Sequence, residues 1–210
     1  QHHVVGIRQV PLLVADDEGV ERVLKSIRRR AAFHSEAEFR LAERRALARE
    51  GDWTSHEEVR DAQTALLSTQ RLLRLARKHG KRIHVLHVTT TQEIELLAQN
   101  KDLASVEITP QHRTLAAPEA YERLKGFAQM NPPIRGAEHR AGLWRGVDQG
   151  VADVIGSDHA PHTREEKAKL YPASPSGMPG VQTLVPLMLT HVAEGRMSLE
   201  RFVDLTSHGV

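Results

Sequence analysis

The chain contains no cysteine, which excludes disulfide bonds, thiolate zinc ligands and a cysteine nucleophile. Aromatic residues make up only 4% of it, so a platform on which nucleic-acid bases could stack is not expected. No apolar run approaches the roughly 20 residues of a membrane span, and no signal peptide is visible. The 29 basic and 27 acidic side chains nearly balance. We therefore expect a cytoplasmic protein that acts on a small molecule, with neither nucleic acid nor a membrane as its partner.

Short apolar segments alternate along the chain with longer segments of helical character. The strand candidates are Val4–Ile7, Ala31–Phe33, Ile83–Leu86, Val106–Thr109 and Val151–Ser157. The helix candidates are Glu18–Arg30, Glu36–Glu50, Glu57–His79, Thr91–Gln99, Pro118–Ala128 and His139–Gln149. This alternation predicts an α/β fold built on a parallel sheet.

The last strand candidate runs directly into the segment Gly156-Ser-Asp-His-Ala-Pro-His162. In a β/α barrel, the carboxyl end of a strand is the rim where chemistry takes place. An aspartate there, Asp158, can ligate a metal and accept a proton from bound water. The alternative is a polar turn that caps the next helix.

Two histidines close other strand candidates, His34 after the second and His87 after the third. Imidazole nitrogen and carboxylate oxygen are ligands that zinc prefers, and catalytic zinc sites keep one position open for water. A single histidine in a strand is more often a core residue. Three such residues at the ends of different strands favour a shared metal site made of His34, His87 and Asp158.

Several motifs together resemble the dihydroorotase family of cyclic amidohydrolases. They are Gly156-Ser-Asp-His-Ala-Pro-His162-Thr-Arg-Glu-Glu-Lys167, Ser176-Gly-Met-Pro-Gly180, Asn131-Pro-Pro-Ile-Arg135, Glu107-Ile-Thr-Pro-Gln-His112 and His84-Val-Leu-His87. The resemblance runs from about Leu12 to the last residue. Hydantoinases and allantoinases share the scaffold, and Asn131 is the residue expected to separate the chain from the hydantoinase branch.

The resemblance implies a TIM-type (β/α)8 barrel of the metal-dependent hydrolase kind. Such a barrel typically takes about 250 residues, whereas five strand candidates account only for its later strands. We therefore expect residues 1–210 to form a single partial barrel domain without the small flanking β domain. The family's first-strand His-x-His-x-Arg element is missing, and Arg8 stands where some members carry a carbamylated lysine.

The function implied by the resemblance is the reversible, metal-dependent ring opening of dihydroorotate to N-carbamoyl-L-aspartate in pyrimidine biosynthesis, with one or two zinc ions in the complete site. His34 and His87 would hold one ion, and Asp158 would help to hold the other and serve as the catalytic base. Substrate binding would fall to Asn131, to His162 and to the backbone near Pro179 and Gly180.

Weaker expectations concern supporting residues. Glu107 and His112 are expected to have a structural role or to orient the ligands, and an additional metal contact is the alternative. The loop Thr163–Pro175 is the candidate for a mobile lid or a disordered excursion.

Two alternative functions stay open: a non-catalytic, dihydroorotase-like scaffold or regulatory subunit, and a hydantoinase or allantoinase type of cyclic amidohydrolase. A homo-oligomer and a complex with another enzyme of pyrimidine synthesis are both compatible with the sequence.

Overall fold

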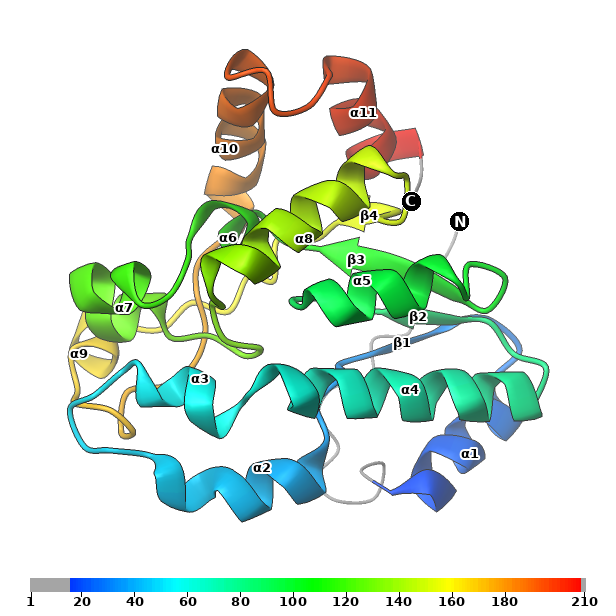
Figure 1. The fold of residues 1–210 in the computed structure, drawn as a ribbon, viewed down its shortest axis with the longest axis horizontal. Coiled ribbons are helices and arrows are strands. Elements are labelled where there is room, and N and C mark those ends of the chain that lie inside the picture. The colour runs from blue at the N-terminus through cyan, green and yellow to red at the C-terminus, as the bar shows by residue number, and fades with distance from the viewer. Residues whose placement is uncertain (1–15, 209–210) are drawn as a thin grey trace.

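The computed structural model describes residues 16–208, so the predicted strand Val4–Ile7 and Arg8 lie outside the described residues. Its strands are β1 (Ala31–Phe33), β2 (Ile83–Val85), β3 (Ala104–Ile108) and β4 (Val154–Ile155). Its helices are α1 (Asp17–Ser26), α2 (Glu38–Arg44), η1 (Arg45–Leu47), α3 (Ser55–Val59), α4 (Ala62–Lys78), α5 (Thr91–Ala98), α6 (Pro110–Thr114), α7 (Glu119–Leu124), η2 (Lys125–Ala128), α8 (Ala137–Asp148), α9 (Arg164–Lys167), α10 (Val181–Ala193), α11 (Leu199–Val203) and η3 (Asp204–His208). Figure 1 shows their arrangement.

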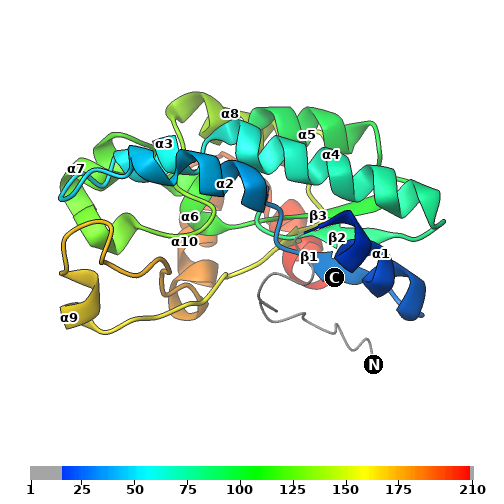
Figure 2. The ribbon, with the colours of Figure 1, turned by 90° about the horizontal axis from the view of Figure 1, so that it is seen from below.

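The four strands form one parallel sheet in the order β1-β2-β3-β4. Each strand connects to the next through helices, as parallel pairing requires. Figure 2 shows α4, α5 and α8 lying on the same face of this sheet. The predicted α/β alternation is confirmed, and the carboxyl ends of all four strands point toward one rim.

The two faces of the sheet differ in chemistry because neighbouring residues of a strand point in opposite directions. Ile83 and Val85 of β2 are fully buried in the core beneath the helices. Between them His84 faces the other way, where its Nδ1 lies 2.7 Å from Ser105 Oγ of β3. Glu107 follows two residues after Ser105 and therefore shares its face. The helix-covered face thus supplies the core, and the other face carries polar groups toward the rim.

The predicted helix Glu57–His79 is wrong in one respect, because it breaks into two helices. α3 ends at Val59, and α4 begins after Asp61, whose carboxylate accepts the backbone N–H of Thr64 at 2.9 Å. An aspartate satisfies the open N–H groups of a helix start better than it fits a helix interior. Arg40 also binds Asp61 and thereby anchors the break against α2.

The segment Thr163–Pro175 is not the disordered excursion that the sequence allowed, because part of it is packed, and its motion as a lid stays a prediction. Thr163 and Glu166 form a capping box at the start of α9. Lys167, Tyr171 and Ser174 are all buried. These three buried side chains anchor the segment to the rest of the fold.

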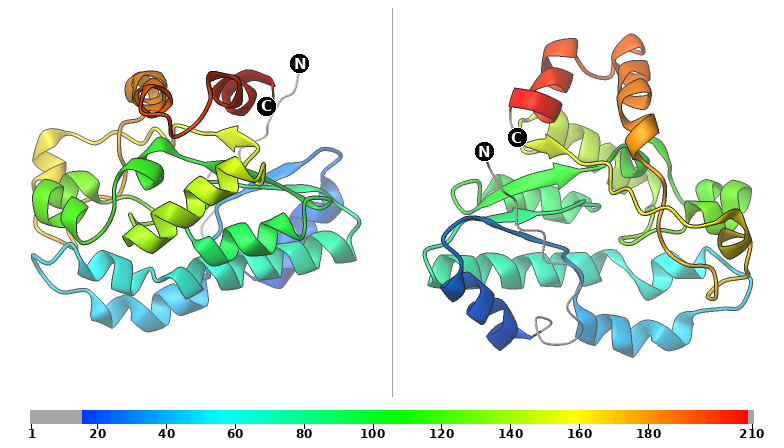
Figure 3. Two further views of the ribbon diagram at one scale, coloured as in Figure 1. Left: turned by 45° about the horizontal axis from the view of Figure 1, so that its top comes forward. Right: turned by 180° about the vertical axis from the view of Figure 1, so that it is seen from behind.

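Within residues 16–208, β1 and β4 are the two edges of the sheet, and each pairs with one strand only. Figure 3 shows α10 and α11 on the β4 side of the molecule. An apolar stripe on α10, made of Val181, Val185 and Leu189, is exposed there. No helix among the described residues combines the length and apolarity needed to cross a membrane.

Helices α5 and α8 pack closely because α8 presents glycines to α5. A Cβ atom at Gly142 would stand 2.1 Å from Thr91 Oγ1, and one at Gly146 would stand 2.8 Å from Ile94 Cδ1. The glycines therefore cost helix propensity but allow the two helices to touch.

We predict that Gly142→Ala destabilises the chain by about 1–3 kcal/mol, because the overpacked contact outweighs the propensity that alanine gains. Urea unfolding of the two proteins measures this difference. The matched substitution Ala141→Gly, at the neighbouring exposed position, costs about 1 kcal/mol through propensity alone. A raised urea midpoint for Gly142→Ala would contradict the close packing.

Candidate active site

The predicted metal ligands stand at the carboxyl ends of their strands. His34 follows β1 directly, His87 lies two residues beyond β2, and Asp158 lies three residues beyond β4. His87 and Asp158 both adopt left-handed backbone conformations, with φ of 34° and 43°. Residues other than glycine pay roughly 1–3 kcal/mol for such strain and keep it where surrounding contacts impose it. Among the described residues other than glycine, Lys125 is the third with a positive φ, so two of the three such residues are predicted ligands.

His34 and His87 face each other directly. His34 Nδ1 lies 2.9 Å from His87 Nε2, and the rings meet edge to face with their centroids 4.7 Å apart. Two nitrogens bound tetrahedrally at about 2.0–2.1 Å from one zinc lie roughly 3.3–3.4 Å apart. If the hydrogen between these nitrogens moves to Nδ1 of His87, a small outward shift of the rings would let both nitrogens bind the same ion.

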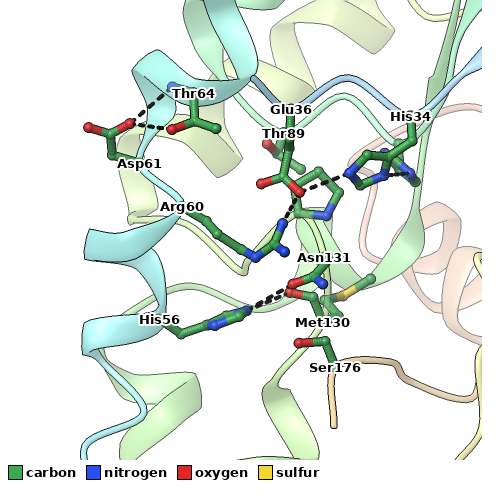
Figure 4. Close-up of polar contacts among 12 residues, drawn as sticks. His34, Glu36, His56, Arg60, Asp61, Thr64, Thr89, Met130, Asn131 and Ser176 are labelled. Atoms are coloured by element: carbon green, nitrogen blue, oxygen red, sulfur yellow. Dashed lines mark hydrogen bonds and ion pairs between the residues drawn. The ribbon is translucent and has the colours of Figure 1, made fainter. Parts of the chain in front are cut away.

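Glu36 holds His34 in the orientation that this requires. The Nε2–H of His34 donates to Glu36 Oε2 at 2.9 Å, so the neutral ring presents the lone pair of Nδ1 to His87. Arg60 pairs with the same carboxylate oxygen, as Figure 4 shows. Burial alone would raise the pKa of Glu36, but the bond to His34 and the charge of Arg60 outweigh it and lower the pKa to about 2. The imidazole of His34 is therefore hydrogen-bonded to an ionised carboxylate, an arrangement that orients metal-binding histidines.

His87 is buried and stays neutral. Burial lowers its pKa well below the ordinary value, and the nearby rings of His34 and His112 add to this effect. Its backbone N–H donates to Glu107 Oε1 at 3.1 Å, which supports the left-handed conformation. Its buried Nδ1 has no hydrogen-bond partner among the described residues. Neutral imidazole is the form that binds metals.

Glu107 also lies next to the Asp158 segment. A Cβ atom at Gly156 would stand 2.4 Å from Glu107 Cδ, so glycine at this position lets the carboxylate fit. Burial raises the pKa of Asp158, and the charge of Glu107 raises it further. Glu107 thus contacts the backbone of one predicted ligand and biases the charge of another, as an orienting residue would.

The donor set of a metal site is incomplete within the described part of the chain. Residues 16–208 contain no group of three histidine, cysteine, aspartate or glutamate side chains placed to hold an ion. The structure brings together His34 and His87, which fit two positions of such a site. The ligand role of Asp158 stays a prediction.

Asn131 is fixed by two buried histidines. His56 Nε2 lies 3.0 Å from Met130 O and 3.1 Å from Asn131 Oδ1 (Figure 4). Because a carbonyl oxygen only accepts, Nε2 carries the proton and Asn131 turns its Oδ1 toward it. His112 Nε2 donates to Pro132 O at 2.9 Å, and its Nδ1 contacts Thr109 Oγ1. His112 thus steadies the Asn131 loop rather than the metal ligands.

The remaining predicted substrate residues lie along the segment after Asp158. His162 is exposed, and its Nε2 donates to Ser176 O at 3.1 Å. Pro179 lines an apolar pocket between α6 and α10. The N–H of Gly180 donates to His159 Nδ1 at 3.0 Å, and a Cβ atom there would stand 2.1 Å from Ser157 O. Close packing is thus sufficient reason for glycine at 180, and substrate contact by these residues stays a prediction.

Sequence reasoning missed the parts that Arg60 and His56 play. Both lie at or next to the start of the predicted helix Glu57–His79, where the sequence indicated no role in the site. Their partners, Glu36 and Asn131, lie 24 and 75 positions away in the chain. The only local signal was an unusual density of ionisable residues at the start of a short helix.

The sequence of the chain is similar to those of known dihydroorotases. No protein-family model matches the chain. A curated dihydroorotase of Methanosarcina acetivorans is 34% identical over 205 residues, which cover 91% of this chain and 44% of that protein. The dihydroorotase of Methanosphaera stadtmanae is 37% identical over 151 residues, or 71% of this chain and 34% of that protein. The chain therefore spans less than half the length of these curated relatives.

Solved structures of cyclic amidohydrolases share the fold. The L-hydantoinase (dihydropyrimidinase) of Arthrobacter aurescens superposes with a TM-score of 0.81 and 28% identity, over 91% of this chain and 45% of that one. A dihydroorotase of Saccharomyces cerevisiae in complex with 5-fluoroorotic acid gives a TM-score of 0.61 at 17% identity, over 70% of this chain and 42% of that one. The four parallel strands thus form an incomplete barrel of the amidohydrolase kind, as the sequence predicted.

The buried histidines predict an acid-sensitive fold. Burial is the main cause that lowers the pKa values of His56 and His112 to about 4. Since the unfolded chain binds these protons near pH 6.5, stability is complete above that pH and is lost as the pH falls toward 4. Each histidine should cost on the order of 2 kcal/mol between pH 7 and pH 5.

We predict that His112→Gln flattens this pH dependence, because the amide can donate to Pro132 O without titrating. Urea unfolding at pH 7 and pH 5 measures the slope. The control is His208→Gln, at an exposed position, and it should leave the slope unchanged. Equal slopes for His112→Gln and the unmodified chain would contradict the role of burial.

Proposed function

Because the chain belongs to the family of cyclic amidohydrolases that includes the dihydroorotases, we propose that the complete protein is a metal-dependent dihydroorotase. It would open the ring of dihydroorotate to N-carbamoyl-L-aspartate and close it in the reverse direction. One observation carries the proposal: two imidazoles converge at adjacent strand ends, and a buried carboxylate orients one of them.

In the proposed reaction, some residues would bind the metal ion and another would transfer the proton. A bound zinc or similar divalent ion supplies an activated water at neutral pH and polarises the ring carbonyl. His34 and His87 would hold this ion, with Glu36 and Glu107 keeping them in place. Asp158 would accept a proton from the attacking water and pass it to the ring nitrogen as the C–N bond breaks.

Asn131 would supply directional recognition of the substrate. Since His56 occupies its Oδ1, the amide nitrogen is the group left to donate to a substrate oxygen. His162 and the backbone near Pro179 and Gly180 would line the opposite side, with His162 toward the carboxylate of dihydroorotate.

Two observations favour other functions and set the design of the assay. The L-hydantoinase of Arthrobacter aurescens is 28% identical to the chain, which favours a hydantoin-type ring as the second candidate substrate. The absence of a three-donor group among residues 16–208 favours a non-catalytic scaffold if the rest of the protein adds no ligands. A cytoplasmic location, an oligomer and a partner enzyme of pyrimidine synthesis remain predictions from the sequence.

The direct test is an assay of the protein expressed from its complete coding region. Ring opening of dihydroorotate and of hydantoin should be compared at equal zinc loading. Preference for dihydroorotate supports the proposal, preference for hydantoin supports the second candidate, and turnover of neither supports the scaffold.

We predict that Asp158→Asn lowers the kcat of that protein by roughly 10²–10⁴-fold, because the amide cannot accept the proton. Zinc content, measured by metal analysis, should change much less, since the amide oxygen can still act as a ligand. The control is Asp148→Asn, at an exposed position on α8. Near-normal hydrolysis by Asp158→Asn would refute the general-base role.

We predict that the 210-residue chain alone retains less than one zinc per molecule after dialysis and opens no dihydroorotate ring. Two converging imidazoles do not hold an ion firmly enough to activate water near pH 7. Metal analysis and a ring-opening assay on this span measure both quantities. Stoichiometric zinc with clear turnover would show that other side chains complete the site.

A further inference from the structure

Lys167 is a buried lysine at the end of α9, and its relative exposure is only 4%. Its Nζ donates to three backbone carbonyls: Gln129 O at 2.9 Å, Pro175 O at 2.8 Å and Gly177 O at 2.9 Å. The partners of this Nζ among residues 16–208 are these three carbonyls and no carboxylate. The ammonium group is therefore held by peptide dipoles alone, although buried charges are usually paired.

Three carbonyls require three donors, and only the charged form of lysine supplies them. Burial lowers the pKa of Lys167 to about 8. At pH 7 the group therefore stays largely protonated, and each N–H can find one carbonyl. A neutral amine has only two N–H donors and would lose one of the three bonds.

The carbonyls come from two segments that lie far apart in the chain. Gln129 stands two residues before Asn131, and Gly177 stands two residues before Pro179. Further bonds join the same segments, since Gly177 N–H donates to Gln129 O at 2.9 Å and Gln129 Nε2 donates to Ser174 O at 2.8 Å. Lys167 lies at the centre of this junction.

The junction extends to the segment that follows Asp158. Ala160 N–H donates to Met178 O at 3.0 Å, and His159 accepts from Gly180 N–H. A Cβ atom at Gly177 would stand 2.4 Å from Ala160 O. Hydrogen bonds thus connect the 176–180 segment both to the loop that carries Asn131 and to the residues next to Asp158.

We propose that Lys167 is a positioning residue that locks the Asn131 loop to the 176–180 segment, so that the two sides of the substrate site keep a fixed separation. That these two segments contact the substrate rests on the proposed function. The lock itself rests only on the three hydrogen bonds and the burial of the ammonium group.

The first test follows the lock in the 210-residue chain by amide hydrogen exchange. Lys167→Met keeps the length of the side chain but removes all three donors. Protection of the Gly177 amide should fall at least tenfold, while the Ile83 amide in the core sheet keeps its protection. The Asn131 side-chain amide resonances should shift or broaden in the same variant. Lys169→Met, at an exposed position two residues away, should change none of these signals.

A second measurement needs no variant. The ¹⁵N-labelled ammonium of Lys167 should give a slowly exchanging resonance, whereas that of Lys169 should exchange rapidly with water. Equal, rapid exchange of both ammonium groups would overturn the lock, and this reading stands even if Lys167→Met fails to fold. Loss of protection spread evenly over the core, or unchanged protection at Gly177, would also overturn it.

The third measurement uses the protein expressed from its complete coding region. Lys167→Met should lower kcat/KM for dihydroorotate at least tenfold, mainly through KM, at unchanged zinc content. Lys169→Met should match the unmodified enzyme. Unchanged kinetic constants in a Lys167→Met protein whose Gly177 protection is lost would refute the link to substrate. If the unmodified protein opens no dihydroorotate ring, the proposed function fails, and the exchange experiments still decide the lock.

Discussion

Parallel pairing of four strands is the constraint on which the rest of this structure depends. It brings every strand's carboxyl end to one rim, so His34 and His87 meet although 53 positions separate them in the chain. Strands of only two to five residues leave little hydrogen bonding to fix that register. The apolar side chains beneath α4, α5 and α8 therefore supply the order, and close contacts such as Gly142 against Thr91 set the distance between helices and hence between strand ends.

Buried polar groups organise the rim that this packing creates. Glu36 is buried and charged because His34 and Arg60 both bond its Oε2, although its buried Oε1 has no hydrogen-bond partner among the described residues. Three other buried side chains, the neutral His56 and His112 and the charged Lys167, donate to main-chain carbonyls of segments that carry predicted site residues. Burying these groups costs desolvation free energy, which their hydrogen bonds offset. Their common effect is to hold loops that have no regular secondary structure of their own.

Much of this could be predicted from the sequence because it depends on local patterns. The apolar runs before His34 and His87 indicated two strands, and parallel pairing of those strands indicated that the two histidines converge. The break at Asp61 was missed although the aspartate three residues before Thr64 is a recognisable N-cap, since the surrounding residues all favour helix. The burial of Lys167 could not be predicted, because a Lys- and Pro-containing segment looks mobile until the carbonyls that surround its ammonium group are known. The pairing of Arg60 with Glu36 was equally hidden, because it depends on how α3 approaches the end of β1.

The described part of the chain contains more residues that orient site groups than residues that could bind a metal directly. Groups that orient other groups are present in detail: Glu36 behind His34, Glu107 behind His87, and His56 and His112 behind the Asn131 loop. Groups that would donate directly to a metal are fewer, and the described residues bring two of them together. A metal site needs both, because donors without orienting partners bind loosely and orienting partners without enough donors bind nothing. The orienting groups of this chain therefore fix two imidazoles at adjacent strand ends, and the two nitrogens alone do not complete a tetrahedral donor set.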